Sequence, residues 1–145
     1  MLFKRVSRAA AEQVFIVVQN VSGGTLTAGY SCCFDLTSPD GVRVTQPATA
    51  FLQAFAGVAD ADIANGAYGL VQVYGYRSSA YISRSAEKAT AAGVECEVLN
   101  ANWGLSPVGG AVSSGQTKAF AFLCEAVTSS ASASYTTAKV FLRAL

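Results

Sequence analysis

The chain has 145 residues, a formal net charge of +1 and charged side chains at only 13% of its positions. This length suits a single domain, and the small net charge excludes the strongly basic surface that attracts nucleic acid or an anionic membrane, so we expect neither as a partner. A typical domain carries about 25% charged residues. Because so few charges oppose self-association, we expect other subunits to cover part of this surface.

The N-terminal segment is the most basic part of the chain. Lys4, Arg5 and Arg8 are three of its ten basic residues. We interpret residues 1–13 as an arm or a short helix and residues 14–145 as a β-rich domain. A basic segment of this kind is a solvated tail or, less often, a segment that docks on an acidic partner.

The sequence predicts a protein that is made and used without export. The apolar run at residues 14–18 directly follows Glu12 and Gln13 and is too short for a signal peptide. No stretch approaches the roughly 18 apolar residues that a membrane span needs. We therefore expect the protein in the cytoplasm of the cell that makes it.

Most of the remaining chain consists of short segments rich in β-branched, aromatic or alternating apolar residues, separated by Gly, Ser, Pro and Asn. The segments expected as strands are residues 14–21, 26–36, 42–45, 70–76, 80–83, 94–99, 119–127 and 139–145. Together they predict an all-β fold: one compact domain, a sandwich or small barrel of about seven to eight short strands.

Four other segments lack a strand pattern. Residues 49–56 have helical spacing over too short a length to assign, and residues 85–93 read equally well as a helix or a loop. Residues 103–114 are loop-like. Residues 128–137 are a low-complexity Ser/Ala/Thr stretch, which we expect to be an exposed connection.

The strand at residues 70–76 has apolar side chains on both faces. Successive residues of a strand point to opposite sides, so Val71 and Val73 share one face and Tyr74 and Tyr76 share the other. A strand with two apolar faces is expected at the centre of a sheet or at a subunit contact.

The cysteines favour packing over chemistry. Cys32 and Cys33 are adjacent, and Cys96 and Cys124 stand alone, without a C-x-x-C pair or any histidine to complete a zinc site. Neighbours in a strand cannot readily bind one metal because they point apart. We interpret all four as small buried hydrophobes of a reducing compartment.

An acidic pair at Asp60 and Asp62 is the strongest candidate for a metal or catalytic site. An EF-hand loop starting at Asp60 fails at positions 5, 6 and 12, which are Ala64, Asn65 and Val71. The preferred interpretation is that both aspartates accept hydrogen bonds from nearby backbone and hold a turn. Without histidine or a recognisable nucleophile motif, we predict no enzyme, no catalytic residue, no metal and no cofactor.

Exposed aromatic residues are the remaining candidates for binding. Trp103 is the lone tryptophan and would anchor an interface, stack on a ligand or fill the core beneath a loop. Tyr68, Tyr74, Tyr76 and Tyr81 lie within fourteen residues of one another. Such density favours a sheet face or a subunit contact over a cofactor pocket.

Two segments resemble the capsid decoration, or cement, proteins of tailed bacteriophages. They are NVSGGTLTAGYSCCFD at residues 20–35 and FAGVADADIANGAYGLVQVYGY at residues 55–76. The shared pattern of the second is Gly57-Val58-Ala59, Ile63-Ala64, Gly66, Gly69, Val71, Val73 and Gly75, and the resemblance covers residues 14–81 best.

The resemblance implies a non-enzymatic, head-stabilising virion protein that binds the outer capsid surface and bridges neighbouring capsomers. It implies the major capsid protein as partner, a homo-oligomer with a trimer favoured, and an arm whose Phe3, Lys4, Arg5 and Arg8 contact the capsid. Further candidate contacts with the capsid or with other subunits are Tyr74, Tyr76 and Trp103.

Two rival functions come from other classes. A carbohydrate-binding or adhesin-type β module would use Trp103 and the tyrosines as sugar platforms. Another self-assembling virion subunit, such as a tail or coat protein, would polymerise as a pure protein.

Overall fold

The computed structural model describes residues 2–4 (backbone), 12–38, 40–84, 90–108, 119–130, 132 and 134–144. In chain order the elements are β1 (Leu2–Lys4), β2 (Gln13–Asn20), β3 (Ser31–Phe34), β4 (Arg43–Thr45), the short 3-10 helix η1 (Leu52–Ala54), β5 (Phe55–Ala59), β6 (Tyr68–Arg84), β7 (Glu95–Val98), β8 (Leu105–Pro107), β9 (Ala121–Leu123) and β10 (Ser134–Arg143). The predicted all-β class and single compact domain are confirmed.

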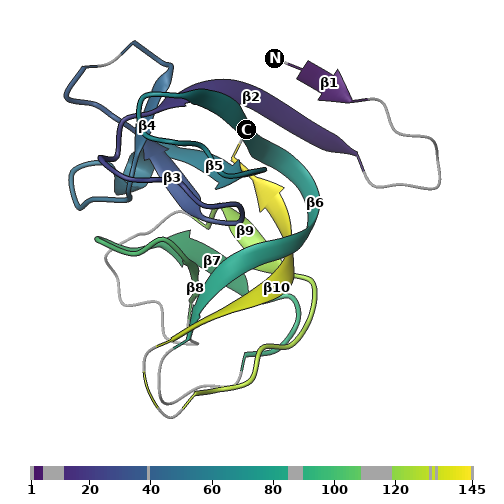
Figure 1. Cartoon of the computed structure of the whole chain (residues 1–145). Helices are drawn as coiled ribbons and strands as arrows, with labels where there is room; N and C mark the ends of the chain where they lie inside the picture. The colour runs from purple at the N-terminus through teal and green to yellow at the C-terminus, as the bar shows by residue number, and fades with distance from the viewer. Residues whose placement is uncertain are drawn as a thin grey trace.

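The ten strands form one sheet that closes on itself twice. Its order is β1-β2-β4-β3-β5-β6-β10-β9-β7-β8, with additional pairings β2–β6 and β6–β8. The first closure makes a ring of β2, β4, β3, β5 and β6, called here the first ring. The second closure makes a ring of β6, β10, β9, β7 and β8, called the second ring. Figure 1 shows the long strand β6 curving from one ring into the other.

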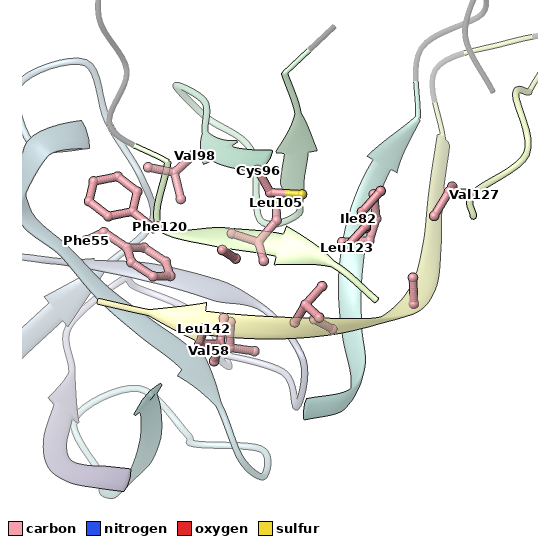
Figure 2. Packing of buried hydrophobic residues seen from close by; sticks show 14 of the residues in the cluster. Phe55, Val58, Ile82, Cys96, Val98, Leu105, Phe120, Leu123, Val127 and Leu142 are labelled. Carbon is pink, nitrogen blue, oxygen red and sulfur yellow. The ribbon is translucent and has the colours of Figure 1, made fainter. Parts of the chain in front are cut away.

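Each ring encloses its own core. The first ring is filled by Val18, Leu26, Cys32, Val44, Ala56, Ala59, Ile63 and Val71. The core of the second ring is larger, and its members include Ile82, Val98, Leu105, Leu123, Val140 and Leu142 (Figure 2). Closing short strands into rings satisfies their backbone groups and removes exposed edges, which suits a protein with few surface charges.

The two rings pack through β3 and β5. Cys33 and Val58 belong to the core of the second ring although their strands close the first, and Phe55 lies 4.8 Å from Phe120 between ring centroids (Figure 2). The adjacent Cys32 belongs to the first core. Both faces of β3 and β5 are therefore buried, and the two rings form a single unit.

The observed strands differ from the predicted ones both in number and in length. Among the described residues ten strands form, against the seven to eight expected: β1, β5 and β8 arise in segments without a strand pattern, and the expected strands at 70–76 and 80–83 are both part of β6. The segment at 128–137 is partly wrong as a connection, since β10 begins at Ser134 and Tyr135 to Thr137 pair with β6. Of the segment at 85–93, which could be a helix or a loop, residues 85–89 lie outside the described part of the chain. Residues 92–93, at its end, form a turn.

At the N-terminus, the backbone of Leu2–Lys4 forms β1, which pairs antiparallel with β2 from Gln13 to Phe15. β1 lies at the end of the strand order, at one side of the first ring (Figure 1). The rest of the predicted arm, residues 5–11, is outside the described part of the chain, so the division into residues 1–13 and 14–145 remains a prediction.

Candidate interaction surfaces

One aromatic surface covers the outside of the second ring. Phe141 on β10 lies directly opposite Tyr76 on β6 and Phe122 on β9, while its neighbours Val140 and Leu142 point into the core. Phe141 stacks on Phe122 with ring centroids 5.3 Å apart and meets Tyr74 edge-to-face at 5.3 Å. We call these four half-buried side chains, Tyr74, Tyr76, Phe122 and Phe141, the Phe141 surface.

Ion pairs border the Phe141 surface on two sides. Arg143 pairs with Glu95, and Lys139 pairs with Glu125 at 3.0 Å. A hydrogen bond from the Lys139 backbone N–H lowers the pKa of Glu125, and the side-chain bond to Glu125 raises the pKa of Lys139. These exposed pairs add little stability, but they surround an apolar centre with both signs of charge, as at the rim of a protein interface.

A second aromatic group connects the two rings. Trp103, in the loop after β7, stacks on Tyr30 at 5.2 Å between centroids with an interplanar angle of 17°. Tyr30 meets Tyr81 of β6 edge-to-face at 5.0 Å, and Tyr81 meets Tyr135 of β10 at 6.2 Å. We call Trp103, Tyr30, Tyr81 and Tyr135 the tyrosine row. Trp103 is half-buried against the first core, so it is neither fully exposed nor a simple core residue.

The acidic pair holds remote segments together, and the prediction of local turn bonds is wrong. Asp62 Oδ1 accepts a 2.8 Å hydrogen bond from the N–H of Ala28, thirty-four residues away. Asp60 lies 3.4 Å from a guanidinium nitrogen of Arg77. Both carboxylates face partners that are distant in sequence, which residue spacing alone cannot reveal.

Arg77 is the centre of a buried polar cluster where β6 leaves the first ring. Its guanidinium donates to the carbonyl of Ala59 at 2.7 Å and to that of Ser79 at 2.8 Å, and more weakly to Gln72 at 3.4 Å. Burial lowers the pKa of Arg77, because removing the cation from water is costly. A small cavity of about 120 Å³ adjoins the cluster, which Gln13 also lines.

The arm residues receive only partial placement. The backbone of Phe3 and Lys4 lies in β1, and Arg5 and Arg8 fall outside the described residues. The structure brings Tyr74 and Tyr76 together with Phe122 and Phe141, and it places Trp103 in a different group. Sequence reasoning missed Phe122 and Phe141 as contact candidates, since only the pairing of β6, β10 and β9 puts them beside the tyrosines.

Three of the four cysteines are buried as predicted, and Cys124 is exposed instead. Burial raises the pKa of Cys33 and of Cys96 to about 12. It raises the pKa of Cys32 further, where the adjacent Cys33 adds to the effect. Burial and the nearby Glu125 carboxylate also raise the pKa of Cys124.

We expect one thiol of the folded protein to react with Ellman's reagent, and four after denaturation in guanidinium. The reactive group is Cys124, since it alone is exposed. Its labelling should quicken with rising pH, because the thiolate is the nucleophile and the pKa is raised. A Cys124→Ser variant should show no fast labelling. Two or more fast thiols in the native protein would contradict the described core.

Among the described residues, no group of three or more His, Cys, Asp or Glu side chains is arranged to hold a metal ion. The same part of the chain contains no helix of the length and apolarity that crossing a bilayer requires.

Comparison with known proteins gives one informative likeness. No protein family matches the sequence, and no curated protein does. Among solved structures, the chain is similar to the N base of head fiber gp8.5 of bacteriophage phi29, with a TM-score of 0.52 and 12% sequence identity. The likeness covers 91% of this chain and 95% of that chain. At this identity the fold is what the two proteins share, and nearly the whole of each chain takes part in it.

Proposed function

We propose that this chain is a structural protein of a phage virion that binds the outer surface of the capsid and stabilises the shell by bridging neighbouring capsomers. The observation that carries the proposal is the likeness in fold, over nearly its whole length, to the base of a phage head fibre. The glycine pattern from Gly57 to Gly75, which resembles capsid decoration proteins, supports the same role from the sequence.

The Phe141 surface is the contact that we assign to this role. Its apolar centre gains free energy when water is removed, and the ion pairs around it can exchange partners with charges on another protein. Aromatic residues are frequent among the residues that dominate interface energies. We therefore include Tyr74 and Tyr76 in the proposed protein contact, with the major capsid protein or with a second subunit.

The arm and the oligomeric state complete the proposal. Phe3, Lys4, Arg5 and Arg8 contact the major capsid protein, and the chain acts as a homo-oligomer, most simply a trimer, assembled in the cytoplasm of the bacterial host. A ligand that binds only the assembled shell stabilises it by mass action. Repetition of modest contacts around a symmetric particle increases the total affinity through avidity.

A second candidate is the attachment base of a longer appendage, which the likeness to a head-fibre base specifically favours. Cryo-electron microscopy of virions separates the two candidates. Density that projects well beyond the volume of this domain favours the base, and density that ends with it favours a decoration protein.

We expect the purified protein to bind heads that lack it and to raise their resistance to heat and osmotic shock. A double variant, Tyr74→Ser with Tyr76→Ser, should bind at least about tenfold more weakly, a change of about 1.4 kcal/mol. The reason is that it removes half of the Phe141 surface while leaving the strand backbone intact. Co-sedimentation with heads measures binding, and circular dichroism verifies the fold.

Tyr68→Ser is the matched control, because Tyr68 is 64% exposed on β6 and belongs to neither aromatic group. It should bind within about twofold of the parent protein, since isolated surface positions contribute little to an interface.

Lys4→Gln, Arg5→Gln and Arg8→Gln together should weaken binding most at low salt. Heads that resist shock equally with and without the protein would remove the stabilising role.

A further inference from the structure

The tyrosine row has a chemistry different from that of the Phe141 surface. Its four members carry a polar atom at the end of an aromatic body, whereas Phe122 and Phe141 have none. In the described part of the chain, no hydrogen bond joins protein to the hydroxyls of Tyr30, Tyr81 and Tyr135 or to Nε1 of Trp103. None of these groups is among the buried unsatisfied atoms of the described residues.

Two glycines make room for the tyrosine rings. A Cβ at Gly29 would lie 2.9 Å from Cδ2 of Tyr81, and a Cβ at Gly104 would lie 2.9 Å from Cδ1 of Tyr135. Each ring therefore rests directly on glycine backbone, closer than any other residue allows. The rings are held by the chain itself, which lowers the entropy that a ligand must overcome to order them.

The loop that carries Trp103 is fixed by several hydrogen bonds. The backbone N–H and the hydroxyl of Ser31 both donate to the carbonyl of Trp103 at 2.8 Å. Asn102 accepts from the N–H of Gly104 at 2.8 Å and donates to the hydroxyl of Ser83 at 3.1 Å. The row is thus preorganised at the Trp103 end as well as at the tyrosines.

We infer that the tyrosine row binds a neutral oligosaccharide. A sugar ring presents C–H groups on its faces and hydroxyls at its edge, and a row of aromatic rings that carry hydroxyl and N–H groups can contact both. The four members of the row, with Asn102 and Ser83 beside them, carry no charge, so these six residues suit a neutral sugar better than an acidic one. Tyr135, the most open member at 45% exposed, lies at one end of the row. This site is separate from the Phe141 surface, and the inference does not rest on capsid binding.

Trp103 provides a direct measurement, because it is the only tryptophan of the chain and lies within the row. We expect cellohexaose, maltoheptaose or chitohexaose, titrated up to about 10 mM to cover weak millimolar binding, to change its fluorescence in a saturable way. The Tyr135→Ser variant should weaken this binding at least tenfold. Tyr135→Phe keeps the ring on Gly104 and should bind within about threefold of the parent protein.

Tyr68→Ser is the control, since Tyr68 is an exposed tyrosine outside the row; it should leave saccharide binding unchanged. Thermal unfolding of every variant verifies that it is folded. No saturable change with any of the three neutral sugars would overturn the inference, as would equal losses in Tyr135→Ser and Tyr68→Ser. Binding of hexagalacturonate alone would overturn the neutral class. Measuring head binding of Tyr135→Ser in parallel, where no change is expected, keeps this test separate from that of the proposed function.

Discussion

Replacing Gly75 with alanine should destabilise the protein by about 4 kcal/mol or more, a size that marks a severe local conflict. Gly75 lies on β6 where the strand passes from the first ring to the second, with φ of +97°. A Cβ there would overlap the carbonyl oxygen of Glu12 and lie 3.2 Å from the Cα of Gln13. The obstacle is backbone on both counts, so no side-chain rotation can relieve it.

Gly93→Ala is the matched control for this prediction. Gly93 has a similar φ of +87°, but a Cβ there meets nothing within 4 Å. It should cost only about 1–2 kcal/mol, the penalty for a side chain in the left-handed region. Chemical denaturation of the two variants measures the difference, which isolates the steric contact of β2 with β6. Equal losses of stability in both variants would show that the backbone at Glu12 and Gln13 does not approach Gly75 as closely as described.

Removing the guanidinium in an Arg77→Met variant should cost about 2–3 kcal/mol, since hydrogen bonds to a charged group contribute roughly 1.5–3 kcal/mol each. Only 10% of the Arg77 side chain is exposed. Methionine keeps the apolar stem but removes the side-chain donor to the carbonyl of Ser79 and one of the two donors to the carbonyl of Ala59, which also accepts from the N–H of Gly29 at 2.9 Å. Hydrogen bonds that a charged group donates contribute more than neutral ones, so losing several of them together is costly.

Arg43→Met provides the comparison, since Arg43 forms an ion pair with Asp40 at 2.9 Å on the exposed surface. That change should cost less than about 1 kcal/mol. Lysine at position 77 should restore little of the loss, because one ammonium cannot reproduce the forked geometry that reaches both carbonyls. Urea denaturation at neutral pH gives the free energies of unfolding. A loss at Arg77 no larger than that at Arg43 would mean that the buried cluster does not join β5 to β6.

Alternation in the sequence identified the strands that have one buried face. In β7, Cys96 and Val98 are buried while Glu95 is exposed, as the pattern at residues 94–99 predicts. The two-sided apolar strand at 70–76 lies in the first half of β6, the strand that both rings share. These strands are readable because burial on one side leaves a period of two in the sequence.

β5, which lies between the two cores, escaped detection for the opposite reason. Every residue of β5 is buried, and so are the first three of β3. Alternation disappears when both faces of a strand are covered. Cys32 and Cys33 point to opposite faces of β3, so that one lies in the first core and the other in the second. Because both are cysteines, the sequence does not reveal which core each one joins.

For the candidate surface residues too, local patterns identify some of them, and only contacts between distant strands identify the rest. The few charges and the absence of histidine predict surface contacts rather than catalysis, and Tyr74, Tyr76 and Trp103 were recognised as aromatic candidates from the sequence. Their partners were not, because Phe122 and Phe141 come from strands far along the chain. Likewise, nothing in the sequence connects Tyr135 with Trp103.

By itself the sequence determined an all-β chain with few charges, several one-sided strands and no recognisable catalytic motif, since these properties depend on local patterns and residue types. Only the tertiary structure decided that the sheet closes twice around β6 and that the aromatic residues divide into two surfaces. It also decided that Gly75 and Arg77 lie where β6 passes from the first ring to the second. These features depend on contacts between residues remote in sequence, and such contacts are selected by the burial of two cores together, which no local pattern encodes.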